Sequence, residues 1–529
     1  MNINISRFAK NKQVEKKSLE EKLPNIEKYI TACKEKLNQI FSEILTEKNQ
    51  EAHKIEASIL EQLMELGLLL LQMYFVNHNE GDYGETIETA KGTAKRGRRS
   101  KKSYFSIFGK LNVSRYLYYI QDESFAPLDI ALNLPRRCYS YFLSEFGNLL
   151  NTNGAYDTSS KLLKKFFGLN LSVSALETIS SEGPIFYDNY YEKKNRFKLE
   201  NEKERTKDTP VKPEYEKNLT VVSFDGKGVP MIKKEAKKIK ARLGKGKKRQ
   251  KKKEALVGVK YNISANIRTP EEIATNLVFP EKKEKTEKKG SNKEVKRVEK
   301  PGDIRYIASI KQPKKEVMEE IKDEIKDENF EHRSLVCVMD GAKHLWTTLK
   351  DVFKEIKNKA LILDIIHVLE YIWLIAHVKY KESSDEAIQY VYEKLLFILQ
   401  GKIASYIMEL QTEKLTGTWK KSQIEKFSKV ITYFKNHKKY MKYDQYLARG
   451  YPIGSGVVES ACSHIVKNRM EISGARWGID GAEAILKLRS IVKSNDWDEY
   501  WKFFTEEAKN NEFFTKGVNS LILQERKAA

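Results

Sequence analysis

The chain has 529 residues, of which 40% are hydrophobic and 11% aromatic, so it is too long for one hydrophobic core and too apolar to be a disordered polymer. Its formal net charge is +23, and the basic residues form blocks, which favours a polyanionic partner over a Lys- and Glu-rich surface that merely keeps the chain soluble. The four cysteines are far apart and form no CxxC pair, which argues against a disulfide framework or a zinc ribbon and fits a reducing cytoplasm.

The sequence predicts neither secretion nor insertion into a membrane. Residues 1–10 contain no sustained apolar stretch of the kind found in signal peptides. The apolar segments further along the chain look shorter than the ~20 residues that a membrane-spanning helix needs. We therefore expect a cytoplasmic protein without a membrane partner.

Residues 1–90 are predicted to form an N-terminal helical arm. Between residues 23 and 78 the apolar side chains recur at helical spacing in two runs, which indicates two long amphipathic helices. Such an arm either packs within its own chain or mediates dimerisation. The sequence does not separate these two roles, although it slightly favours packing.

Residues 91–127 are predicted to form a basic linker followed by a β-hairpin. The linker combines glycines with a dense run of basic side chains and is suited to contacts with phosphate groups. The candidate DNA-binding residues in it are Lys95, Arg96, Arg98 and Arg99. Aromatic and β-branched residues then predict strands over 103–108 and 111–120, joined at Gly109 and Lys110.

Residues 128–190 are predicted to be helical, with a segment that resembles a helix-turn-helix. The pattern gives one helix over 157–167, a turn over 168–171 and a second helix over 172–181, with Ser172 and Ser174 as candidate N-caps. In a helix-turn-helix the second helix enters the DNA major groove. Many helical hairpins bind nothing, so DNA binding here rests on the charge of the whole chain.

A catalytic core is predicted from residue 215 to residue 370, because acidic residues follow apolar runs there. Runs 219–224, 335–339 and 360–363 predict strands that end at Asp225, Asp340 and Asp364, and runs 255–263 and 303–310 predict two more. Three strands with an early acid, followed by alternating strands and helices, match a mixed α/β sheet. This pattern resembles the RNase H-like fold.

A third carboxylate, Glu459, follows a Gly-Ser-Gly turn and starts a predicted helix over 457–470. Carboxylates at two strand ends and on a later helix can converge on a pair of divalent cations, which is the chemistry of phosphodiester cleavage and transfer. Two ambiguities stay open in the sequence. Either Asp340 or Asp364 supplies the second ligand, with Asp340 favoured, and Glu471 competes with Glu459 from about three turns further along the helix.

Several segments in this order resemble the DDE transposases of bacterial insertion sequences, in particular the ISKra-type family, which is related to the Mutator-like branch. They are FDGKGVPM at 224–231, LDIIHVLEYIW at 363–373, PIGSGVVES at 452–460, KNRM at 467–470 and GARW at 474–477. The likeness covers roughly residues 219–496. It implies an RNase H-like catalytic domain with a helical insertion at 371–450 and the last core helices at 451–495. A C-terminal helical tail is expected at 496–529.

The resemblance also implies roles for individual residues. Asp225, Asp340 and Glu459 would be the catalytic ligands of Mg²⁺ (or Mn²⁺), and Asp364 and His367 would match an Asp-x-x-His element of secondary importance. His367 is equally compatible with a buried histidine that pairs with a carboxylate. Further candidates for DNA contact lie near the motifs: Lys227, Lys467, Arg469 and Arg476.

The function implied is DNA transposition by metal-dependent strand cleavage and strand transfer. The partners would be double-stranded DNA, both the transposon ends and the target, and further copies of the chain, and the location would be the nucleoid in the cytoplasm. Two alternatives remain open. One is an RNase H-like nuclease without strand transfer, and the other is a non-catalytic DNA-binding protein derived from a transposase.

Overall fold

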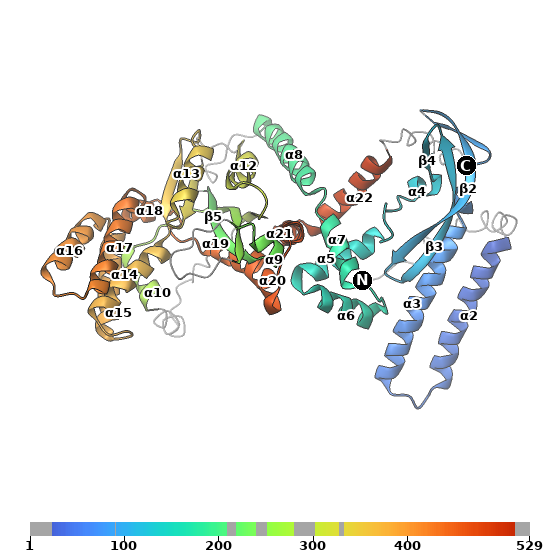
Figure 1. The fold of residues 1–529 in the computed structure, drawn as a ribbon, viewed down its shortest axis with the longest axis horizontal. Coiled ribbons are helices and arrows are strands. Elements are labelled where there is room, and N and C mark those ends of the chain that lie inside the picture. Colours follow the sequence, from blue (N-terminus) through green and yellow to red (C-terminus); the bar gives the residue numbers. More distant parts are fainter. Residues whose placement is uncertain are drawn as a thin grey trace. The chain divides into compact units, whose positions relative to one another are not determined.

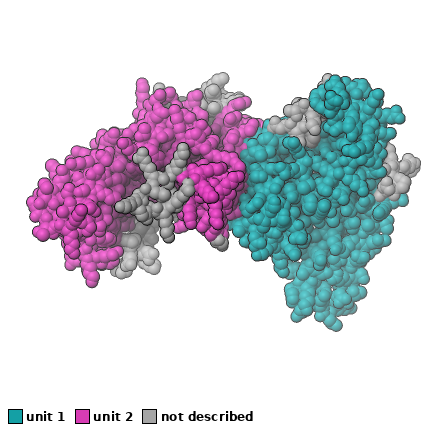
Figure 2. Space-filling model, viewed as in Figure 1, with its two compact units in different colours: residues 1–186, 498–529 teal, residues 187–497 magenta. Residues whose placement is uncertain are grey.

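The computed structural model describes residues 24–89, 91–208, 218–239, 251–279, 302–326 and 333–513. Contacts along the chain divide it into two compact units (Figure 2). Unit 1 comprises residues 1–186 and 498–529, and unit 2 comprises residues 187–497. The predicted arm and the predicted C-terminal tail each include residues outside the described ranges, namely 1–23, 90 and 514–529.

Unit 1 begins with the two predicted helices, α2 (Pro24–Thr46) and α3 (Ala52–Val76), which lie side by side as a hairpin (Figure 1). The far end of α3 packs on the sheet of unit 1, where Phe75 joins a buried cluster with Leu111 and Val113. Contrary to the prediction, α3 is long and apolar enough to cross a membrane by length and composition, with a mean hydropathy of 1.5 in its most apolar window.

The sheet of unit 1 has four antiparallel strands in sequential order: β1 (Thr86–Thr89), β2 (Gly92–Ser106), β3 (Gly109–Ile120) and β4 (Glu123–Phe125). A short 3₁₀ turn, η2 (Asn79–Gly81), precedes it. The hairpin is confirmed, but the basic segment predicted to be a linker is mostly strand. Residues 92–102 belong to β2, which pairs with β3 from Lys95 onward with an irregularity between Arg96 and Arg99.

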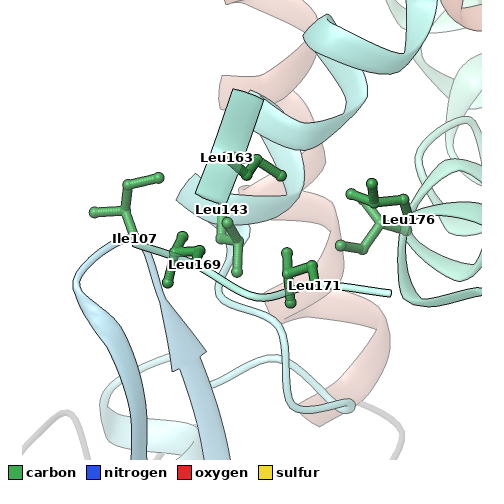
Figure 3. Packing of buried hydrophobic residues seen from close by; sticks show 7 residues of the cluster. Ile107, Leu143, Leu163, Leu169, Leu171 and Leu176 are labelled. Carbon is green, nitrogen blue, oxygen red and sulfur yellow. The ribbon is translucent and has the colours of Figure 1, made fainter. Parts of the chain in front are cut away.

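The helices of unit 1 confirm the predicted helical segment. Figure 3 shows the apolar cluster that holds them together, in which Ile107 from the β2–β3 turn meets leucines of three helices and of the α6–α7 connection. Helix α6 ends at Gly168 and α7 begins at the N-cap Ser172, whose Oγ accepts a hydrogen bond from the Ala175 amide. The helices are α4 (Pro127–Ala131), α5 (Tyr141–Asn153), α6 (Tyr156–Phe167), α7 (Val173–Glu182) and α22 (Trp497–Phe513).

Unit 2 is built on a mixed five-stranded sheet with the order β7-β6-β5-β8-β9. Strand β6 pairs antiparallel with both β5 and β7, whereas β8 and β9 run parallel to β5. All five predicted strands are confirmed. Their bounds are β5 (Asn218–Pro230), β6 (Lys252–Ser264), β7 (Gly302–Ser309), β8 (Ser334–Met339) and β9 (Lys359–Leu363).

Helices surround this sheet. Helix α21 packs on β7, and Glu483 of α21 accepts a hydrogen bond from Ser309 Oγ over 2.8 Å. Helix α12 packs on β6 and β7, whereas α10 packs on the helix Asp385–Leu399. The helices are α8 (Tyr187–Asp208), α9 (Lys233–Ala236), α10 (Pro270–Val278), α12 (Lys314–Ile325), α13 (Lys343–Val352) and α21 (Ile479–Lys493).

The predicted insertion is a cluster of helices that follows β9 (Figure 1). It includes α14 (Ile365–Lys379), α15 (Asp385–Leu399), α16 (Ile403–Thr416), α17 (Lys421–His437), η4 (Lys438–Tyr440) and α18 (Tyr443–Ala448). Two tyrosines of α18 bind the edge strand β9. Tyr443 donates to the carbonyl of Leu363 over 2.8 Å, and Tyr446 donates to that of Leu361 over 3.1 Å.

The helix predicted over 457–470 is present but is not uniform. It begins as α19 (Gly456–Ala461), continues as the π-helical segment η5 (Cys462–Lys467) and ends as α20 (Asn468–Met470). A 3₁₀ turn, η6 (Ile472–Gly474), follows. The π segment was not predicted, because amphipathic spacing over so few residues does not distinguish it from an α-helix.

Candidate active site

Three aspartates lie level with one another on adjacent parallel strands. Strand β5 pairs with β8 up to Val222 and Cys337, and β8 pairs with β9 up to Met339 and Leu363. Continuing these registers by three residues and by one residue brings Asp225 beside Asp340 and Asp340 beside Asp364. Because parallel strands present their carboxyl ends at the same edge, the three acids belong to one edge of the sheet.

Asp225 lies within β5, which continues to Pro230 instead of ending at this residue as predicted. Its Oδ1 accepts a hydrogen bond from the Gly226 amide over 2.6 Å, and its Oδ2 accepts one from the thiol of Cys462 over 3.3 Å. Burial raises the pKa of Asp225, and the charge of Asp340 raises it further, whereas the Cys462 and Gly226 donors lower it. Asp225 is therefore a partly buried carboxylate close to another acid.

Asp340 follows β8 in a turn that aromatic residues hold in place. Its Oδ1 accepts from the Ala342 amide over 3.0 Å, and its backbone carbonyl accepts from Trp346 Nε1 over 2.6 Å. Trp346 in turn stacks on Tyr440 of the insertion, with ring centroids 4.2 Å apart and an interplanar angle of 6°. The insertion thus fixes the backbone of Asp340 while one of its carboxylate oxygens has no hydrogen bond within the described part of the chain.

Asp364 is completely buried and forms the N-cap of α14. Its Oδ1 accepts from the amides of Ile366 over 3.2 Å and Ser455 over 3.0 Å, and its Oδ2 accepts from Ser455 Oγ over 2.8 Å. Both carboxylate oxygens are therefore engaged by the protein. The hydrogen bonds join the start of α14 to the loop before α19, which suits a structural role better than an open ligand position.

Glu459 and His367 lie close to Asp364. One possible ligand atom each from Asp364, His367 and Glu459 fall within 4.8 Å of one another. Ser455 Oγ donates to Glu459 Oε1 over 3.4 Å as well as to Asp364, so this serine links the two acids. Nδ1 of His367 lies 3.2 Å from Oε2 of Glu370.

The electrostatics show that these groups share one environment. Burial by itself lowers the pKa of His367, but the charges of Asp364, Glu370 and Asp340 outweigh it and raise that pKa. Burial raises the pKa of Glu459, the charges of Asp364 and Asp225 add to this, and His367 partly offsets it. Mutual repulsion among the acids is the condition that a bound cation relieves.

The donor set fits a hard divalent cation. Carboxylate oxygens are the ligands that Mg²⁺ and Mn²⁺ prefer, and one imidazole is compatible with Mn²⁺. The predicted triad of Asp225, Asp340 and Glu459 does not itself form a group of three with ligand atoms within 4.8 Å, among the residues that the structure describes. The structure brings Glu459 to Asp364 and His367, with Asp225 and Asp340 close enough to shift the pKa values of this group.

Glu471, the alternative to Glu459, lies outside the group formed by Asp364, His367 and Glu459. It lies beyond Met470, where α20 ends, and forms an ion pair with Lys252. The lysine lowers the pKa of Glu471 through this hydrogen bond. Glu471 therefore does not take part in the acidic group.

The predicted DNA-binding residues differ in accessibility. On β2, Lys95 and Arg98 are exposed and have no ion-pair partner within the described residues, whereas Arg96 pairs with Asp82 and Arg99 with Glu80. In unit 2, Lys467 and Arg476 are exposed and Lys227 is half-buried. The prediction for Arg469 is wrong, because its side chain is only 2% exposed and lies over the ring of Trp477 at 4.7 Å.

Sequence reasoning missed three residues of the site. Ser455 holds Asp364 and Glu459, Cys462 holds Asp225, and Tyr433 of the insertion packs against the turn after Asp340. A β-carbon on Gly341 would lie 2.4 Å from Cε2 of the Tyr433 ring, so only glycine fits there without a shift. The Gly-Ser-Gly turn was a visible signal for Ser455, but nothing in the sequence pointed to the other two.

A cavity of about 770 Å³ lies in unit 1 and is lined by residues of α5, α7 and α22 with the segments next to them. None of the predicted site residues lines it.

Searches against models of protein families and against curated proteins found no match.

Proposed function

We propose that the chain is a metal-dependent DNA transposase of the DDE kind, with an RNase H-like catalytic domain in unit 2. The fold supports this proposal in two ways. Three antiparallel strands precede two parallel strands that are connected through helices, as expected for this domain. A helical cluster separates the last strand from the helix of Glu459, where the family carries its insertion.

The observation that carries the proposal is the level arrangement of Asp225, Asp340 and Asp364 at one sheet edge, with Glu459 next to them. Strand ends and a later helix supply these acids from positions far apart in the sequence. The charge of Asp340 raises the pKa of Asp225, and the charges of Asp364 and Asp225 raise the pKa of Glu459. Within the described residues these acids have no lysine or arginine among their hydrogen-bond partners, which is unfavourable for folding alone. The binding of cations would offset this cost.

Within this proposal the acids divide by role. Asp340 and Asp225 are the metal ligands at the sheet edge, Glu459 completes the site from α19, and Asp364 with Ser455 positions Glu459. When bound, two Mg²⁺ or Mn²⁺ ions supply an activated water and stabilise the leaving 3′ oxygen. No covalent intermediate with the protein is required. His367 supplies a positive charge beside these acids when it is protonated.

DNA is the substrate that the charge of the chain favours. The net charge of +23 attracts polyanions, and exposed lysines and arginines lie on β2 and beside the acidic group. Lys467 is exposed on the π-helical segment that follows Glu459, and Lys227 is two residues from Asp225. Within this proposal, these side chains contact phosphates near the scissile bond.

The test uses the purified full-length chain, Mg²⁺ or Mn²⁺, and a plasmid that carries the coding element with its natural flanks. A transposase gives both nicked or cut ends and joined products, and the Asp225→Asn variant gives neither while its DNA affinity stays within about twofold of the wild type. Asp122→Asn, in an exposed turn of unit 1, is the matched control and keeps full activity.

Three results would contradict the proposal. Cleavage without any joined product would indicate a nuclease, and DNA binding without cleavage in either metal would indicate a non-catalytic DNA-binding protein. Full activity of the Asp225→Asn variant would show that the acids at the sheet edge are not the catalytic group.

A further inference from the structure

The hairpin of α2 and α3 has two sides of opposite character. On its polar side, Lys36 of α2 pairs with Glu65 of α3, and Glu43 accepts hydrogen bonds from Ser58 over 2.6 Å and from Gln62. Between the helices, Ile26, Cys33 and Ile40 of α2 and Leu66 of α3 are buried. The remaining side carries large apolar residues that stay exposed.

This apolar side consists of nine residues from both helices. They are Ile30, Leu37, Phe41, Ile44 and Leu45 of α2 and Leu60, Leu63, Leu70 and Tyr74 of α3. Each is between 37% and 71% exposed. On a helical projection they follow the buried seam on the flank opposite to Lys36 and Glu43. The hairpin is therefore covered on one flank by its own polar contacts. On the other flank these nine side chains stay exposed, although Phe108 of the β2–β3 turn packs beside Gly67 of α3.

The spacing of these residues is that of helices packed on helices. Ile30, Leu37 and Ile44 are seven residues apart, and so are Leu63 and Leu70. A seven-residue repeat keeps one apolar stripe facing a partner helix along its length, as in coiled coils and four-helix bundles. The partner that fits is therefore another pair of helices.

We propose that the apolar side of the hairpin binds the same side of a second copy of this chain, so that two hairpins form a four-helix bundle. A two-fold axis lets one surface serve both partners. If a fully exposed large side chain presents about 200 Å², the exposed fractions of the nine residues amount to roughly 900 Å² per chain. That area is typical of one partner in a stable protein–protein interface. The proposed dimer does not depend on the catalytic proposal.

A lipid bilayer is the other occupant that α3 suggests by its length and composition. The polar side argues against it, because Lys36, Glu43 and Glu65 would have to enter the same apolar layer. Glu56 and Glu61 add two further negative charges to α3, which disfavours an anionic membrane surface. A helical partner would bury the apolar side and leave the polar side in water, whereas a bilayer would also surround the polar side with hydrocarbon.

The test is the mass of the full-length chain in solution, measured by sedimentation velocity at high salt so that DNA does not bridge copies. The wild type is expected at twice 61.5 kDa. The variant Phe41→Glu with Leu63→Glu is expected to weaken the dimer by at least about tenfold, because it places charges at the centre of the apolar side. The control, Met408→Glu with Leu415→Glu, changes two exposed residues of α16 in the same way and stays dimeric.

A photo-crosslinking amino acid keeps the test decisive if the double variant fails to fold. Placed at Phe41, it should give a crosslinked dimer, and placed at Leu415 it should not. A wild type that is monomeric at tens of micromolar, or a dimer that survives in a folded double variant, would overturn the proposal. So would binding of the wild type, but not of the double variant, to phosphatidylcholine vesicles.

Discussion

The thiol of Cys462 donates a hydrogen bond to Oδ2 of Asp225 across 3.3 Å, joining the π-helical segment after Glu459 to the central strand of the sheet. Cys462 is buried, and burial followed by the charge of Asp225 raises its pKa, so the thiol stays protonated and remains a donor. It stabilises the ionised form of Asp225. Cys462 therefore influences the protonation state of a proposed metal ligand.

Replacing Cys462 by alanine should move the acid limb of the cleavage activity to higher pH. The thiol lowers the pKa of Asp225, so its removal raises that pKa and leaves fewer ionised molecules at mildly acidic pH. Cys462→Ser keeps a donor and should stay close to the wild type. The pH–rate profiles of the three proteins at saturating Mg²⁺ are the measurement, and superimposable profiles would contradict the assignment.

Asp225→Asn should stabilise the metal-free protein at neutral pH. The pKa of Asp225 is raised above its ordinary value of 3.8, so its contribution to stability is complete below 3.8 and is lost as the pH rises through the folded-state pKa. The variant removes the charged form and should unfold about 2–4 °C higher at pH 7, with the difference shrinking towards pH 4. Added Mg²⁺ should raise the melting temperature of the wild type only.

Asp340→Asn and Asp364→Asn should fail in different ways. Asp340 has an open carboxylate oxygen, so its variant should lose at least about a hundredfold in metal-dependent cleavage with little change in stability. Asp364 accepts three hydrogen bonds in a buried position, so its variant should lose about 1–3 kcal/mol of unfolding free energy. Urea unfolding together with cleavage assays separates the two. The opposite pattern would make Asp364 the ligand.

Gly341→Ala should reduce cleavage through a clash with Tyr433. The added β-carbon would lie 2.4 Å from the ring, which is closer than side chains tolerate, so the turn after Asp340 must shift at a cost of about 1–3 kcal/mol. Trimming the partner in the double variant Gly341→Ala with Tyr433→Leu should restore part of the activity. Gly478→Ala, where a β-carbon meets nothing within 4 Å, is the matched control. No recovery in the double variant would show that Tyr433 is not the obstacle.

Binding to DNA should depend on the free cations of β2 more than on its paired ones. Replacing Lys95 and Arg98 together by alanine should lower the slope of log affinity against log salt by about 0.9 for each phosphate that they neutralise in the wild type. Arg96→Ala should change the slope less, since its guanidinium already binds both oxygens of Asp82. Affinities at four salt concentrations decide the matter, and an unchanged slope in the Lys95/Arg98 variant would exclude β2 as a phosphate-binding strand.

The strands of unit 2 could be predicted because they contain apolar runs, and because an acid directly follows both β8 and β9. The first half of strand β2 could not be predicted, because it is rich in lysine and arginine and not in the β-branched and aromatic residues that are typical of strands. Pairing with the aromatic strand β3 overrides that local preference, and Tyr119 covers Gly97 of β2. The prediction for Arg469 failed for a related reason. A basic residue near the acidic motifs suggested a contact with phosphate, but in the structure Arg469 is buried against Trp477.

Within the site, the sequence identified the acids but not what holds them. Ser455 reaches Asp364 across 91 positions and Cys462 reaches Asp225 across 237. Contacts at such separations leave no periodic trace in a single sequence. The sequence favours Asp340 over Asp364 as a ligand but contains no information on the hydrogen bonds that distinguish the two carboxylates.

The π-helical segment Cys462–Lys467 makes the chain tolerant of a loss of one residue at one place. A wide turn of this kind holds one residue more than an ordinary helical turn, so deleting a single residue there would leave a continuous α-helix with Glu459 undisturbed at its start. The side chains beyond the deletion would keep their directions, with Arg469 still over Trp477. The same deletion from an ordinary α-helical turn would rotate every side chain beyond it by roughly 100°.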